Sequence, residues 1–311
     1  MKRTKILAEG AIIASLFMIL LLITIAVPIL NIISIWTLPL PFIIYVVRNG
    51  LKPGFMLLAV ASALSFMIGG LPFIPLALFF GSAGLVIGEL YRRQLSGFSV
   101  LLGGGLIYIL NMLLSYILLV LFLNEHPLQL IEEVMTEQIQ FAESMLANLG
   151  QDPSGTMDAL YQMVDIISYM IPVMIVITGV LFAVVSTVLA GLLLRRLGHD
   201  VNKLPPFRDW SFPKSILWIY LLAMVMFLFG LEEGSTLFII VWNVFPLLEV
   251  IMTIQGLAFI AFYCYHKQIT KALPIIVTIC GFIFYPLFTV IRILGIVDLG
   301  FDLRKRIINP K

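Results

Sequence analysis

The chain has 311 residues, of which 61% are hydrophobic and 12% are charged, and its mean hydropathy is +1.10. In a globular domain about a quarter of the residues are charged. This composition therefore excludes an ordinary soluble protein and indicates an integral membrane protein. The small net charge of +2 gives no basic face for nucleic acid, and two cysteines and three histidines in separate contexts predict no disulfide framework, metal site or cofactor.

The apolar stretches predict an all-α fold, a polytopic bundle of eight or nine transmembrane helices. A helix needs about 20 apolar residues to cross the hydrocarbon core. We expect the second stretch to be broken or re-entrant, because it contains Asn31, Trp36, Pro39 and Pro41. The nine candidate segments are 8–27, 29–47, 54–68, 71–90, 98–123, 166–194, 215–230, 237–264 and 273–297.

The basic residues predict a cytoplasmic N-terminus. In that orientation fourteen of the nineteen lysines and arginines lie in the cytoplasm, in clusters at 2–5, 48–52, 92–93, 195–214 and 267–271. Nine spans would place Arg304, Lys305 and Arg306 outside, against the same rule. If the eighth segment or the ninth, which contains Pro286, were re-entrant, eight crossings would return this tail to the cytoplasm.

An acidic insert, residues 124–165, separates the fifth and sixth segments and is predicted to lie outside the cytoplasm. It has eight acidic residues and no lysine or arginine. Apolar residues recur at helical spacing from Leu128 to Leu149, so we expect an amphipathic helix that begins near Pro127. It is either a lid over the outer mouth of the bundle or a solvated connector.

The sequence contains no motif for catalysis. The glycines at 103–105 are not followed by Lys-Ser or Lys-Thr, as a phosphate-binding loop requires, and no H-E-x-x-H pattern occurs. We therefore expect that the protein is not an enzyme.

A few polar residues inside the apolar segments are candidates for a structural or functional role. Burying a charge in hydrocarbon costs about 2.5 kcal/mol or more, so such groups normally face a partner or a cavity. Glu249 and Arg292 are predicted to form an intramembrane charge pair or to line a polar pathway. Asn111 either hydrogen-bonds a neighbouring helix or contacts a ligand.

Small residues four apart mark one face of the first segment. Gly10 and Ala14 would permit the close approach of another helix, either within the chain or from a second membrane protein. We expect one of these two forms of helix docking.

The chain resembles the YybS-like family of uncharacterised bacterial membrane proteins over nearly its full length. The resemblance is carried by IQGLAFIAFYCYHK (254–267), GIVDLGFDLRKR (295–306) and the acidic insert. It implies a multi-pass protein of the bacterial plasma membrane.

Residues 1–196 also resemble the substrate-binding S components of energy-coupling-factor (ECF) vitamin transporters. The basic start, the small residues of the first segment, the broken second segment, RNGLKPG (48–54) and Arg92–Arg93 carry this resemblance. It implies a six-helix bundle that binds a small organic molecule through Asn31, Trp36 and Asn111. It also implies that Gly10 and Ala14 meet a coupling membrane protein driven by separate ATPases. The long insert and residues 197–311 depart from that pattern.

These observations leave two functions open. With a membrane domain at 1–196, a cytoplasmic linker at 197–214 and further membrane helices at 215–311, the protein is either a ligand-binding subunit of an ECF-like uptake system or a membrane scaffold or regulator that binds other envelope proteins. The first predicts a polar pocket beneath the insert at which Asn31, Trp36 and Asn111 converge. The second predicts docking surfaces on the insert and tail.

Overall fold

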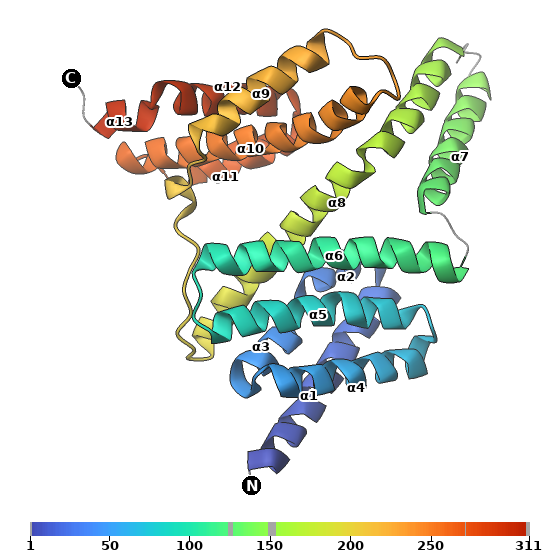
Figure 1. The fold of residues 1–311 in the computed structure, drawn as a ribbon, viewed down its shortest axis with the longest axis vertical. Coiled ribbons are helices and arrows are strands. Elements are labelled where there is room, and N and C mark those ends of the chain that lie inside the picture. The colour runs from blue at the N-terminus through green and yellow to red at the C-terminus, as the bar shows by residue number, and fades with distance from the viewer. Residues whose placement is uncertain (1, 124–126, 149–153, 271, 309–311) are drawn as a thin grey trace. The chain divides into compact units, whose positions relative to one another are not determined.

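The computed structural model describes every residue except 1, 124–126, 149–153, 271 and 309–311 (Figure 1). Within this described part the regular elements are all helices, which confirms the predicted all-α class. They are α1 (Lys2–Ala26), α2 (Pro28–Ser34), η1 (Ile35–Thr37), α3 (Leu40–Asn49), α4 (Leu51–Gly69), α5 (Phe73–Arg92), α6 (Gly97–Leu123), α7 (Pro127–Asn148), α8 (Ser154–Arg196), η2 (Phe207–Asp209), α9 (Lys214–Leu228), α10 (Thr236–His266), α11 (Ala272–Ile283), α12 (Pro286–Phe301) and α13 (Leu303–Ile308).

Seven helical segments of the described chain are long and apolar enough to cross a membrane. They are 4–26, 28–49, 51–69, 73–92, 97–121, 166–196 and 236–266, and α9 and α11 are shorter apolar helices. The second segment is broken, as predicted, because α2 gives way to the short η1 and α3 begins only after Pro39. The predicted ninth segment is also interrupted, since α11 ends at Ile283 and α12 begins at Pro286.

The chain divides into two compact units. The first unit comprises residues 1–137 and 174–204, and the second comprises 138–173 and 205–311. This division differs from the predicted one because the start of α8 packs with the C-terminal helices. There Tyr169 of α8 contacts Phe238 of α10, with ring centroids 5.4 Å apart.

The first unit is built around an apolar core from α1, α3, α4, α5 and α6 and the second half of α8. Two of its buried tyrosines bond to partners inside the core. Tyr108, fully buried, lies 2.8 Å from the hydroxyl of Ser186, and Tyr91 donates to the carbonyl of Thr187 at 2.9 Å. Internal partners are what a bundle in hydrocarbon requires, because no water is present to replace them.

The second unit is centred on α10, which packs against α9 and α12. Tyr220 of α9 stacks on Phe245 of α10 with centroids 5.7 Å apart. The crossing of α10 and α12 depends on two glycines, because a Cβ at Gly256 or Gly295 would overlap a carbonyl of the facing helix. Small residues thus allow these two backbones to approach closely.

The insert forms α7, which begins at Pro127 as predicted. Its apolar face is only partly covered, since Ile139 is buried while Ile131, Val134 and Met145 are exposed.

Candidate functional site

An open cleft of about 410 Å³ lies in the first unit between α4, α5 and α6. This volume falls within the range of small-molecule sites. Most of its wall is apolar. Its lining residues are Leu51, Phe55, Ser82, Leu85, Val86, Glu89, Leu90, Arg93 and Ile107.

A charged cluster lies at the end of the cleft where α5 terminates. Glu89, which is buried, accepts hydrogen bonds from Arg92 Nε at 2.7 Å and Arg92 Nη2 at 2.8 Å, and from Arg93 Nε at 2.7 Å. Both guanidinium groups are substantially exposed. Because two cations share one carboxylate, the cluster keeps a net positive charge.

Ser82, one helical turn below Val86, is the other polar residue of the cleft. Asn111 of α6 donates to Ser82 Oγ at 2.8 Å and to the carbonyl of Phe79 at 2.9 Å. The structure therefore shows Asn111 in an interhelical hydrogen bond that fixes the α5–α6 contact beside the cleft.

The residues predicted to bind a ligand do not line this cleft. Asn31 of α2 is exposed, and Trp36 of η1 packs on Phe182 with ring centroids 4.7 Å apart. Phe182 also contacts Phe79, whose carbonyl accepts from Asn111. The amide of Asn111 is occupied by α5, so Trp36 and Asn111 belong to the packing around these phenylalanines.

The small face of α1 packs within the chain, which is one of the two forms of helix docking expected for Gly10 and Ala14. Ala14 is 2% exposed and belongs to the core. A Cβ at Gly10 would lie 2.9 Å from the hydroxyl of Tyr45 on α3. Gly10 and Ala14 therefore let α3 and its neighbours approach α1.

In the second unit, Glu249 of α10 and Arg292 of α12 are in direct contact. Both are largely buried, and Arg292 also contacts the hydroxyl of Tyr220. This is the helix-to-helix ion pair that the sequence analysis offered as one of its two alternatives.

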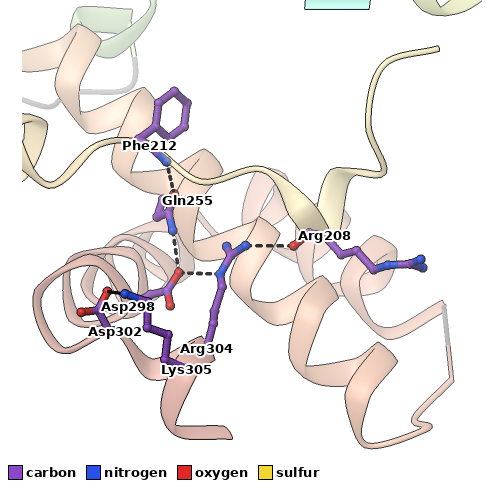
Figure 2. A network of polar contacts seen from close by, with 7 residues as sticks. All are labelled: Arg208, Phe212, Gln255, Asp298, Asp302, Arg304 and Lys305. Carbon is purple, nitrogen blue, oxygen red and sulfur yellow. Dashed lines mark hydrogen bonds and ion pairs between the residues drawn. The ribbon is translucent and has the colours of Figure 1, made fainter. Parts of the chain in front are cut away.

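A second polar network lies two helical turns further along the same two helices (Figure 2). Gln255, almost fully buried, donates to Asp298 at 2.5 Å and accepts from the backbone N–H of Phe212 at 3.0 Å. Arg304 donates to Asp298 at 2.9 Å and to the carbonyl of Arg208 at 2.9 Å. The network joins α10, α12, the tail and the segment before α9.

An exposed ion pair reinforces this junction. Lys214, at the start of α9, donates to Asp302 at 2.5 Å. That hydrogen bond lowers the pKa of Asp302 below its ordinary value of 3.8. A shallow pocket of about 140 Å³ adjoins these residues.

These contacts place the C-terminal tail on the same side of the second unit as the segment before α9. The guanidinium of Arg208 lies 3.6 Å from the ring centroid of Tyr265, so α10 returns to that side. Because α12 leads into the tail, α11 must run away from that side and α12 must return to it. Its α11 has 12 residues, about 18 Å at 1.5 Å per residue, which is too short for a hydrocarbon core of about 30 Å.

Backbone groups of the turn between α11 and α12 form hydrogen bonds within the turn, as a segment inside a membrane requires. Phe284 N–H donates to the carbonyl of Cys280, and Leu287 N–H to that of Phe284. The chain thus turns back between α11 and α12, and the tail around Arg304 lies on the same side of the second unit as Arg208 and Lys214.

Asn243 of α10 repairs a break in α8. Pro172 lies inside this helix, and the side chain of Asn243 bonds to the backbone next to it. Its Oδ1 accepts from Val173 N–H at 3.0 Å and its Nδ2 donates to the carbonyl of Tyr169 at 2.8 Å. These two groups would bond each other in a regular helix, so Asn243 replaces that bond.

Within the described residues, no group of three or more His, Cys, Asp or Glu side chains could hold a metal ion.

Comparisons with known proteins identify the family. Residues 15–299 match the family model described as "Predicted membrane protein (DUF2232)". The chain is also 34% identical to "Uncharacterized protein YybS" of Bacillus subtilis (strain 168), across 99% of this chain and 100% of that protein. No solved structure matches. These findings confirm the YybS-like resemblance and leave that to S components without support: the chain belongs to the DUF2232 family of predicted membrane proteins.

Proposed function

We propose that this integral membrane protein binds a small, largely apolar molecule in the cleft between α4, α5 and α6. The observation that carries the proposal is the cleft itself, a space of about 410 Å³ with an apolar wall and polar groups near its ends. Binding pockets typically combine a mainly apolar wall with a few placed polar groups. The proposed function is binding rather than catalysis.

The cleft differs from the site that the transporter resemblance implies. It lies toward the end of α6 that follows Arg93, whereas the insert leaves from the opposite end of that helix. The proposal therefore does not require the coupling protein and ATPases of an ECF-like system. Purification from native membranes in mild detergent, followed by identification of co-purifying proteins, tests that further role.

The binding proposal is tested by extracting bound molecules from the purified protein. Ile107→Trp fills the cleft from α6, and Leu110→Trp is the matched control on the exposed side of the same helix. We expect mass spectrometry to find a molecule retained by the wild type and by Leu110→Trp but lost from Ile107→Trp. Equal retention by all three proteins, or none by any, would overturn the proposal.

A scaffold or regulator is the second candidate, because the insert helix keeps part of its apolar face uncovered. Val134 and Met145 are each more than half exposed. Replacing both with glutamate would abolish capture of an envelope protein if this face binds one, and would leave the cleft ligand unaffected.

We further propose that the N-terminus and the junction of Arg208 with Arg304 lie in the cytoplasm of a bacterial cell, in agreement with the positive-inside rule. Labelling of single cysteines introduced at Lys5 and Lys305 by a membrane-impermeant maleimide tests this orientation. Labelling of either one in intact cells would contradict it.

A further inference from the structure

We infer that the occupant of the α4–α5–α6 cleft is an anionic phospholipid, with its head group at Arg93 and an acyl chain along the apolar wall. This inference rests on the proposed binding function and names its ligand class.

The first argument is the charge at the end of the cleft. Arg92 and Arg93 share the single carboxylate of Glu89, and only one Arg93 nitrogen is used in that contact. Two cations against one carboxylate favour a negatively charged head group. Basic pockets between membrane helices are known to hold such groups. Lys52, exposed in the first turn of α4, follows the lining residue Leu51 in sequence and carries a further positive charge at this end of α4.

The second argument is the chemistry of the wall. Six of the nine lining residues are apolar, and the cleft is bounded by three membrane-spanning helices. Phe55, at 58% exposure, marks a side that in a bilayer faces acyl chains. A polar metabolite would need several hydrogen-bonding groups along the wall. An acyl chain needs none.

The third argument is that the polar group deepest along α5 is already engaged. Ser82 accepts a hydrogen bond from Asn111, which is itself held by the carbonyl of Phe79. The other polar lining residues, Glu89 and Arg93, both lie at one end of the cleft. This one-ended polarity matches an amphiphile.

The test compares lipid retention by the full-length protein in native mass spectrometry, after exchange into micelles that contain phosphatidylglycerol or phosphatidylcholine. We expect the wild type to retain phosphatidylglycerol more strongly. Arg93→Gln should weaken that retention about fivefold, given about 1 kcal/mol per cation near a membrane surface. Phosphatidylcholine binding should be unchanged.

Two further variants separate failure of this inference from failure of the proposed function. Arg196→Gln, at the exposed end of α8, removes the same charge away from the cleft and should leave retention unchanged. Lys52→Gln repeats the charge test without disturbing Glu89. If Ile107→Trp releases a bound molecule but neither charge variant alters phosphatidylglycerol binding, the lipid assignment is overturned while the binding function stands. If Ile107→Trp changes nothing, both fail.

Discussion

The ion pairs of the first unit lie near the ends of their helices, whereas the second unit also has ion pairs that are largely buried between helices. Arg48, at the end of α3, pairs with Glu9 near the start of α1, and Glu89 pairs with arginines where α5 ends. In the second unit, by contrast, Glu249–Arg292 and Asp298–Arg304 lie between α10, α12 and α13. The first unit contains a cleft with a mostly apolar wall. In the second unit, polar contacts join α10, α12 and α13.

This difference separates a binding role from an anchoring role. In the first unit the wall of the cleft between α4, α5 and α6 is mostly apolar, and its charged groups lie at one end. A buried ion pair, in contrast, specifies which side chains must meet. We therefore place the ligand in the first unit and assign the charges of the second to holding its hairpin and tail.

The largest effect should follow from breaking the Glu249–Arg292 pair. Arg292→Leu leaves an unpaired buried carboxylate, which should lower the free energy of unfolding by about 3–5 kcal/mol. The double variant Glu249→Leu/Arg292→Leu leaves no unpaired charge and should be much less destabilised. Denaturant unfolding in mixed micelles measures both. Strict additivity of Arg292→Leu and Glu249→Leu, each measured alone, would show that the pair is not coupled and would remove the proposed contrast between the units.

A smaller effect should follow from removing the amide that bridges the break in α8. Asn243→Leu loses the bonds to Val173 and Tyr169, which should cost about 1–2 kcal/mol. Hydrogen exchange of peptides that cover 168–176 should become faster. Thr253→Val is the control, because that hydroxyl bonds only within α10, to the carbonyl of Glu249. Unchanged exchange in Asn243→Leu would mean that α8 does not need the bridge.

Much of the fold follows from local sequence properties. Long apolar runs specify α1, α4, α5 and α6, and Pro127 and Pro286 mark helix starts because proline suits the first helical turn. The contact between Glu249 and Arg292 was foreseeable as a possibility, since two opposite charges in apolar segments require partners.

The site was less accessible to prediction, because it depends on helix rotation and packing. Nothing in the residue pattern shows that Asn111 faces Ser82, or that a void opens beside them. Asp298 was missed because it was assigned to the tail beyond the ninth segment, and its partner Gln255 lies 43 positions earlier. In the sequence Asn243 is an amide side chain inside the apolar segment 237–264. Its position in α10 opposite Pro172 in α8 was the available signal, and only the fold brings them together.

The smallest effect should be the pH dependence of the exposed Lys214–Asp302 pair, which marks the surface edge of the second unit's polar network. Because the lysine lowers the pKa of Asp302 in the folded state, its stabilisation is present above the unfolded value of about 3.8 and is lost as pH falls through the folded value. Asp302→Asn suits the left-handed backbone at this position, where φ is 50°. The stability difference between wild type and Asp302→Asn should therefore be constant near neutral pH and vanish in acid. A stability difference that persists below the folded pKa would show that Asp302 acts through its backbone geometry. The electrostatic stabilisation of the second unit would then come from its buried ion pairs alone.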